Sequence, residues 1–440
     1  MKKLLFLLCV LSPSVFAQSV IGSWSGELSF QGVKLPLIIH IKPAGDGITA
    51  TMDSPYQGAK DLPVQVAKWE DELLTIEVTN IGLSYKAKLV TPDSLHGDFS
   101  QGPLKVKFGM SRSKGEKPLV RPQTPEGPYA YYTEEVTVKN EVEGNVLAGT
   151  LAAPDQSTKH PILVMITGSG AQTRDEELFG HKPFLVIADH LAKQGIATLR
   201  LDDRGMGQSE AGKPDATSAD YAGDILSAVN FLSKRGYKNI GLLGHSEGGM
   251  IAPMVNSSKV KFMVLLAAPG IPIVELMRAQ TYEIGRSQGA PEAMAKRISD
   301  TNYKLYQYMN SYKGSDFRAD VLKYLKEEMK DPQAETTIKQ VESEWFRYFI
   351  AFDPTSYLKK VKVPVLALNG TKDVQVTAKE NLEGLRASLP KNKKTEILAM
   401  EGLNHLFQTA KTGSVMEYGQ IEETISPAVL EKIASWIKSL

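Results

Sequence analysis

The sequence has little of several features that would restrict its function. Its 440 residues include one cysteine, Cys9, and the formal net charge is +1. One cysteine can form neither an internal disulfide nor a cysteine-based metal site. Balanced charge provides no overall field that would attract the phosphates of nucleic acids or membranes. We therefore expect neither nucleic acid nor a membrane surface as a partner, and no thiol-bound metal.

Long hydrophobic runs are also scarce. The apolar run nearest the start covers residues 4–11 and follows two lysines, whereas a membrane-spanning helix needs about 20 residues. With Val-Phe-Ala at residues 15–17, which resembles a cleavage site, this run predicts a signal peptide over residues 1–17. Cys9 lies within it. Export without disulfides favours the bacterial periplasm, with full secretion as the alternative, and we expect no transmembrane anchor later in the chain.

The rest of the chain changes texture near residue 115. Up to that point, short alternating apolar and polar stretches are interrupted by Gly, Pro and Asp, which predicts a small antiparallel sandwich or barrel over residues 18–115. Residues 116–129 are rich in proline and are expected to form a linker. Residues 130–440 would then form a second, larger domain.

The larger domain shows an alternation of strands and helices. Residues 162–166 and 196–201 are apolar runs typical of buried parallel strands, and a helical pattern at residues 184–193 separates them. A second helical pattern at residues 221–234 precedes another apolar run at residues 240–243. This alternation predicts an α/β domain with a doubly wound, mainly parallel sheet, whose reactive groups gather at the carboxyl ends of the strands.

The most informative motif is GHSEGG at residues 244–249, which follows the apolar run at residues 240–243. It fits G-x-S-x-G, in which a sharp strand-to-helix turn presents a strained serine and the small residues allow backbones to approach. Ser246 is therefore the candidate nucleophile. The alternative is a glycine-rich turn whose serine only caps the next helix.

A nucleophilic serine needs a base and an orienting acid. Of the seven histidines, His405 lies just after the strand-like residues 395–399, and it is the candidate base. Asp373 follows the apolar run at residues 363–368 and is the candidate acid, which would hold the imidazole tautomer and stabilise the imidazolium. His181 is the less convincing alternative base, and we expect it instead to contact substrate.

The chain order Ser246, Asp373, His405 is characteristic of α/β-hydrolases. Residues 130–440 resemble this superfamily, and in particular its bacterial branch of serine aminopeptidase-like and esterase-like hydrolases, here with an N-terminal β-rich domain. The segments that carry the resemblance are residues 167–170, 202–209, 244–249, 369–373 and 402–405. The resemblance implies an α/β-hydrolase fold.

The same resemblance implies an oxyanion hole and a cap. One oxyanion donor should be the backbone N–H of Glu247, and the other should come from Ser169 or, with slight preference, Gly170 in the loop after the first buried strand. Residues 270–353 carry amphipathic helical patterns where relatives carry a cap. Trp345 and Phe349 are expected to line an apolar substrate pocket. The helical patterns cover residues 274–287, 294–308, 320–329 and 335–352.

Two charged clusters lie near these loops. Residues 174–177 follow the oxyanion loop, and we expect a solvated face rather than a pocket rim. Residues 202–205 follow the second buried strand and are expected to brace loops around the elbow.

The favoured hypothesis is an exported serine hydrolase, a carboxylesterase that forms an acyl-enzyme at Ser246 and needs neither metal nor organic cofactor. Its substrate would be a small-molecule ester. The first alternative is an aminopeptidase-like serine peptidase acting on short peptides, in which Glu275 or Glu283 would hold the substrate's amino terminus. The second is a catalytically silent binding protein on a hydrolase scaffold. The sequence gives no indication of oligomeric state.

Overall fold

The computed structural model divides into two compact units, Met1–Pro118 and Leu119–Leu440. The predicted signal peptide, with Cys9, lies outside the residues that the structure describes. Across the described residues, no helix combines the length and apolar character needed to cross a membrane. The described ranges are residues 20–30, 33–55, 59–102, 104–113 and 120–440.

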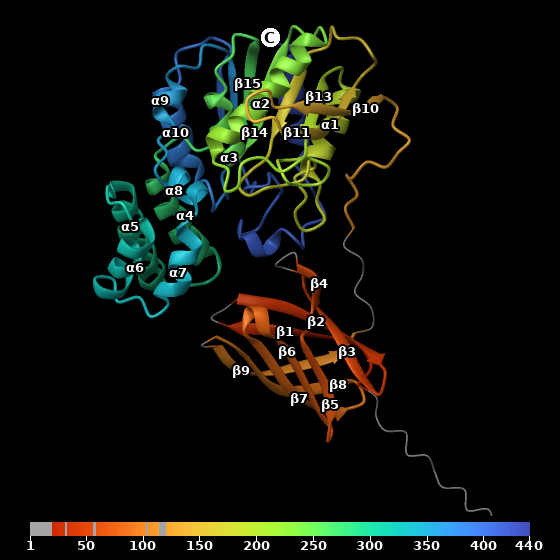
Figure 1. Cartoon of the computed structure of the whole chain (residues 1–440). Coiled ribbons are helices and arrows are strands. Elements are labelled where there is room, and N and C mark those ends of the chain that lie inside the picture. Colours follow the sequence, from red (N-terminus) through yellow and green to blue (C-terminus); the bar gives the residue numbers. More distant parts are fainter. Residues whose placement is uncertain (1–19, 31–32, 56–58, 103, 114–119) are drawn as a thin grey trace, which may run out of the picture. The chain divides into compact units, whose positions relative to one another are not determined.

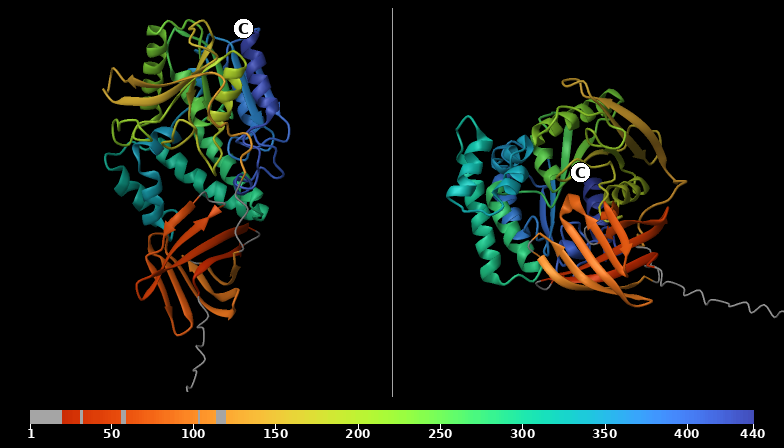
Figure 2. Two further views of the ribbon diagram at one scale, coloured as in Figure 1. Left: turned by 90° about the vertical axis from the view of Figure 1, so that its right-hand side faces the viewer. Right: turned by 60° about the horizontal axis from the view of Figure 1, so that its bottom comes forward.

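The first unit is one antiparallel sheet that curls around its own core (Figures 1 and 2). Its strand order is β4-β3-β2-β1-β9-β8-β7-β6-β5. Alternate residues point inward, as the pleat requires, and the core includes the fully buried Trp24, Tyr85 and Phe99. A short 3₁₀ helix, η2 (Thr79–Ile81), connects β6 to β7. The strands are β1 (Gly22–Phe30), β2 (Val33–Ala44), β3 (Gly47–Ser54), β4 (Ala59–Pro63), β5 (Val66–Glu70), β6 (Leu73–Val78), β7 (Leu83–Thr91), β8 (Ser94–Gln101) and β9 (Leu104–Arg112).

The second unit contains an eight-stranded sheet in the order β10-β11-β13-β12-β14-β15-β16-β17. The strands from β13 to β17 are parallel, which confirms the predicted α/β class, while β10 and β11 add an antiparallel edge. The sequence patterns did not predict these two edge strands. The strands are β10 (Tyr132–Lys139), β11 (Val146–Ala153), β12 (Ile162–Ile166), β13 (Ala197–Leu201), β14 (Ile240–His245), β15 (Val260–Leu266), β16 (Val365–Gly370) and β17 (Glu396–Met400).

Helices cover both faces of this sheet (Figure 1). In β12, Leu163 and Met165 belong to the core that includes α1 and α11, whereas Val164 belongs to the core that includes α2 and α10. Because successive side chains point to opposite faces and both faces are covered, the strand is apolar throughout. The covering helices are α1 (Pro183–Lys193), α2 (Ser218–Lys234), α3 (Glu247–Ile251), η3 (Ala252–Met254), α10 (Ala378–Ser388) and α11 (Pro427–Lys438). A short 3₁₀ helix, η4 (Val415–Glu417), lies in the connection between β17 and α11.

A group of helices is inserted between β15 and β16, and Figure 1 shows α4 to α8 gathered beside the sheet. One difference from the sequence expectation concerns residues 335–352, where the structure has two helices instead of one. The chain breaks at Ser343, whose side chain accepts a hydrogen bond from the N–H of Phe346 and so starts a new helix. The helices are α4 (Ile273–Ser287), α5 (Glu292–Ser311), α6 (Phe317–Glu327), α7 (Ala334–Val341), α8 (Glu344–Ile350) and α9 (Thr355–Leu358).

The expected linker at residues 116–129 also differs from the structure. Arg121 donates hydrogen bonds to the carbonyl oxygens of Ile421, Phe179 and Gly419. Gln123 accepts from the N–H of Thr424. These contacts attach the stretch after residue 119 to the second unit, because long polar side chains there satisfy loop carbonyls that have no partner in regular structure. Residues 116–119 lie outside the described residues.

Candidate active site

Ser246 stands at a strained turn between β14 and α3. Its backbone has φ 54° and ψ −119°, and its side chain makes no capping hydrogen bond to α3. A Cβ on Gly248 would lie 2.1 Å from the carbonyl oxygen of Ile166, so only glycine allows this turn to press against β12. The geometry is that of a nucleophile elbow rather than of a simple helix-capping serine.

Asp373 and His405 meet in loops that follow neighbouring strands, β16 and β17. Nδ1 of His405 lies 2.8 Å from Oδ2 of Asp373, and both residues are buried. The other carboxylate oxygen of Asp373 accepts hydrogen bonds from the backbone N–H groups of Gln375 and Val376, each at 2.8 Å. The acid is therefore fixed by backbone donors. With its Nδ1 engaged, the imidazole has Nε2 available to exchange protons with a hydroxyl.

Ser246 and His405 line the same cavity, which has a volume of about 400 Å³. Cap helices α4 and α8 supply much of its apolar wall, including the predicted Trp345 and Phe349, whose rings stack at 5.4 Å. The remaining cap side chains in the wall are Leu276, Met277, Gln280 and Phe346.

The carboxylates considered for an aminopeptidase lie elsewhere. Glu275 accepts a hydrogen bond from the hydroxyl of Tyr303, and Glu283 lines a separate groove beside α10. Neither lines the cavity that contains Ser246. The described walls of that cavity therefore lack the two amine-binding groups that the sequence offered.

The loop after β12 lies directly against Ser246. A Cβ built on Gly168 would be 3.3 Å from Cβ of Ser246. The N–H of Gly168 already donates a hydrogen bond to Glu176, so it is not available to donate one to an oxyanion. Of the two predicted partners for Glu247, Ser169 lines the cavity with Ser246, whereas Gly170 lines adjoining cavities. Ser169 and Gly170 both stay predicted as the second donor, and Ser169 is the one that lines the cavity with Ser246.

The side chain of Glu247 connects the elbow to the cap. Its carboxylate accepts hydrogen bonds from the hydroxyl of Ser218 at 2.6 Å and from Nε1 of Trp345 at 3.0 Å. Burial raises the pKa of Glu247, against the effect of these hydrogen bonds and one from the Ser169 side chain. Trp345 is consequently held in place at its indole nitrogen while its ring faces the cavity.

His181 is fully buried and does not line this cavity, which corrects the expectation of a substrate contact. Nδ1 of His181 lies 2.8 Å from Oγ1 of Thr424, and Nε2 lies 3.0 Å from the carbonyl oxygen of Tyr418. Burial lowers the pKa of His181 to about 4. A neutral histidine in these surroundings joins loops and has no surface for a ligand.

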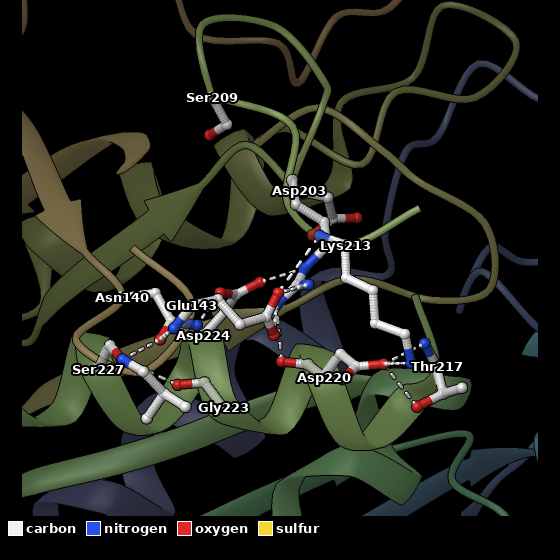
Figure 3. A network of polar contacts seen from close by, with 12 residues as sticks. Asn140, Glu143, Asp203, Ser209, Lys213, Thr217, Asp220, Gly223, Asp224 and Ser227 are labelled. Carbon is white, nitrogen blue, oxygen red and sulfur yellow. Dashed lines mark hydrogen bonds and ion pairs between the residues drawn. The ribbon is translucent and has the colours of Figure 1, made fainter. Parts of the chain in front are cut away.

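Residues 202–205 brace loops, as expected. Arg204 is buried and donates to Asp224 and Glu143 at 2.8 Å each. Asn140 donates to the second oxygen of Asp224. Figure 3 shows Asn140, Glu143 and Asp224 close together beside α2. The carbonyl oxygen of Asp220 accepts a further hydrogen bond from Arg204. The network joins the turn between β10 and β11, the loop after β13, and α2.

The expectation of a solvated face at residues 174–177 is wrong. Arg174 forms an ion pair of 2.7 Å with the buried Asp202, and Glu176 is itself buried. Sequence reasoning also missed the side chain of His245, which contacts Glu176. The one feature of the sequence that could have indicated the burial of Glu176 was the position of residues 174–177, just after the predicted oxyanion loop.

The fold and the site together define an α/β hydrolase. The family model described as serine aminopeptidase, S33, matches residues 183–409, more than half of the chain. The chain belongs to this family.

Several proteins similar to this chain are esterases. Esterase EstD of Thermotoga maritima is 25% identical over 344 residues, which cover 77% of each chain. Among solved structures, the Pyrococcus furiosus esterase Pf2001 is 14% identical, with 74% of this chain and 98% of that chain covered and a TM-score of 0.43. Est1E of Butyrivibrio proteoclasticus, bound to ferulic acid, is 15% identical, with 69% and 96% covered and a TM-score of 0.42.

Proposed function

We propose that the protein is an exported serine esterase that hydrolyses small-molecule carboxylic esters. The observation that carries this proposal is a single cavity lined by Ser246 and by a His405 whose Nδ1 is held by Asp373. The wall built by α4 and α8 is largely apolar and suits a neutral acyl or aryl group. The similarity to esterase EstD supports an ester rather than a peptide substrate.

In the first half of the proposed reaction, Oγ of Ser246 attacks the ester carbonyl while Nε2 of His405 takes its proton. His405 then donates that proton to the leaving alcohol as the carbon–oxygen bond breaks, which leaves an acyl-enzyme. In the second half, His405 takes a proton from water as the water oxygen attacks the acyl carbon. The bond between the acyl carbon and Oγ of Ser246 then breaks, Oγ takes the proton from His405, and the carboxylic acid leaves. The backbone N–H groups of Glu247 and Ser169 would stabilise the oxyanion in both halves.

A substrate panel tests this proposal. The purified protein without residues 1–17 is assayed with p-nitrophenyl esters, thioesters and aminoacyl-nitroanilides of matched acyl groups. We expect turnover of esters that exceeds turnover of nitroanilides by at least about tenfold. Glu275 and Glu283 do not line the cavity, and the two carboxylates in its wall, Glu176 and Glu247, already accept hydrogen bonds from other side chains. Preferential cleavage of aminoacyl-nitroanilides would establish the aminopeptidase instead. Absence of all turnover and of fluorophosphonate labelling would establish the silent binding protein.

Export is tested separately. Expression of the full chain in a bacterium, followed by fractionation and mass measurement, should give a periplasmic protein that begins at Gln18. A cytoplasmic protein that retains residues 1–17 would contradict export without bearing on the chemistry.

A further inference from the structure

The residue before the nucleophile makes contacts that the proposed reaction does not use. His245 is buried, with its Nδ1 3.0 Å from Oε1 of Glu176 and its Nε2 3.0 Å from the carbonyl oxygen of His405. A carbonyl oxygen can accept a hydrogen bond but cannot donate one, and the same is true of an ionised carboxylate. Both ring nitrogens therefore donate, and His245 and Glu176 form a buried ion pair behind the elbow.

Glu176 extends this chain of contacts to the oxyanion loop. The same oxygen, Oε1, accepts the N–H of Gly168 at 2.7 Å. Glu176 is 5% exposed and adopts φ 52°, in the left-handed region that a residue with a side chain seldom occupies. Gly168 in turn lies against Ser246. Hydrogen bonds thus run without a break from the oxyanion loop through Glu176 and His245 to the main chain of His405.

The charge state of His245 agrees with this geometry. Burial by itself favours the neutral imidazole, but the charge and hydrogen bond of Glu176, followed by the hydrogen bond to the His405 carbonyl, outweigh burial and raise the pKa of His245. Removal of the Glu176 charge would reverse that balance. A neutral His245 has one N–H and can keep only one of its two contacts.

We propose that Glu176 and His245 are positioning residues, which hold the oxyanion loop and the main chain of His405 in register with the nucleophile elbow. This inference rests on the proposed function. Asp373 fixes the ring of His405 at Nδ1, and His245 fixes the same residue at its carbonyl oxygen, so two separate contacts orient the base. Since His245 belongs to the elbow itself, any movement of the base relative to Ser246 must stretch this contact.

The test uses Glu176→Gln, which keeps the side-chain volume, and His245→Phe, which keeps a ring but removes both N–H donors. Fluorophosphonate labelling carried to completion counts the intact sites, so turnover is expressed per titrated site and does not depend on the folded fraction. We expect each variant to lose about tenfold to 100-fold in kcat with KM little changed, because small misplacements of reacting groups cost that much. The rate of labelling should fall in parallel.

The double variant separates a shared role from two independent ones. If the pair acts as one chain, Glu176→Gln combined with His245→Phe should lose no more than His245→Phe alone. The matched control is the His40–Asp53 pair of the first unit, with Nε2 and Oδ2 2.9 Å apart. His40→Phe should leave kcat per titrated site at the wild-type value.

Three results would overturn the inference while wild-type Ser246 is labelled and active. In the first, both single variants have a kcat per titrated site within about twofold of wild type. In the second, KM changes and kcat does not. In the third, the loss of kcat in the double variant equals the product of the losses in the two single variants. A wild-type protein that is not labelled at Ser246 would overturn the proposed function first and this inference with it.

Discussion

At the scale of single residues, a serine, a histidine and an aspartate are not enough to define a site. The first unit has its own trio, in which Nδ1 of His40 lies 2.7 Å from Oγ of Ser23 and Nε2 lies 2.9 Å from Asp53. These residues face one another across three adjacent strands of a curled sheet. Ser246 differs because its backbone is strained, it directly follows the buried strand β14, and it lines a cavity.

This contrast gives a matched experiment. If Ser246 is the nucleophile, as proposed, Ser246→Ala should abolish fluorophosphonate labelling and lower ester turnover on the order of a million-fold while the fold is kept. Ser23→Ala should keep both labelling and turnover. The measurements are mass spectrometry of the labelled peptide and steady-state kinetics. Labelling that survives in Ser246→Ala and disappears in Ser23→Ala would transfer the nucleophile to the first unit.

His181 predicts how stability depends on pH. Its pKa is about 4 in the folded protein and 6.5 in the unfolded chain, so between these values the unfolded state binds more protons. This group's contribution to the free energy of unfolding is therefore intact above pH 6.5 and is lost progressively as the pH falls to about 4.

Chemical denaturation at a series of pH values measures that dependence. We expect the free energy of unfolding to fall more steeply between pH 6.5 and 4 in the wild type than in His181→Gln, which has no proton to bind there. His160→Gln is the control, because His160 lies at the surface with Asp155. Identical slopes in the wild type and His181→Gln would mean that His181 does not titrate in this window.

At the scale of elements, α8 connects the cap to the elbow. Its Trp345 both lines the cavity and donates to Glu247, and Phe349 stacks on it. The element is short, and its position depends on Ser343 at its start and on packing against α4 and α5. Small changes in α8 should therefore alter the pocket wall without moving the triad.

Substitutions in this part of the cavity wall should change which ester is the best substrate. Phe349→Ala enlarges the cavity, so we expect the best p-nitrophenyl ester to shift to a longer acyl chain, with each methylene worth roughly 1–3 kcal/mol of discrimination. Trp345→Phe should produce a smaller shift, since it removes the indole hydrogen bond and little volume. The measurement is kcat/KM across an acyl-chain series. Tyr324→Leu serves as the control, because Tyr324 stacks on Tyr308 within the cap and does not line the cavity.

At the scale of the whole molecule, each unit has its own hydrophobic core. The core of the first unit is filled by large side chains such as Trp24 and Tyr85. Among the residues that the structure describes, those that line the cavity with Ser246 belong to the second unit. The chain between the units is not a simple linker throughout, because Arg121 and Gln123 are bonded to the second unit.

Two shortened chains test this division. A chain that begins at residue 119 should keep the wild-type order of ester preference. A chain that begins at residue 129 loses the contacts of Arg121 and Gln123, and we expect its free energy of unfolding to fall by about 3 kcal/mol or more, since hydrogen bonds of charged groups contribute roughly 1.5–3 kcal/mol each. Denaturation and the ester series measure the two effects. Equal stability of both chains would show that these contacts contribute nothing, and an altered preference in the longer one would assign part of the pocket to the first unit.

The sequence alone determined the α/β class, and it nominated Ser246, Asp373 and His405, of which the structure places His405 beside Asp373 and in the same cavity wall as Ser246. Ser246 and Asp373 follow β14 and β16, which are buried throughout and read as continuous apolar runs. His405 follows the partly buried edge strand β17, and its position at a strand end was the signal there. The two edge strands, β10 and β11, escaped notice, as did the break in the helical pattern at Ser343. In both cases the local pattern is weak and packing decides.

The tertiary structure decided which polar side chains meet. Glu176 and His245 are 69 residues apart, and His245 and His405 are 160 apart, so no periodic pattern joins them. In the sequence, residues 174–177 look like a solvated charge run, and His181 is a candidate for contact with substrate. Only the folded chain shows that Glu176 and His181 are both buried and bonded to other loops, because the energy of a buried charge or imidazole depends on the partners that distant segments bring to it.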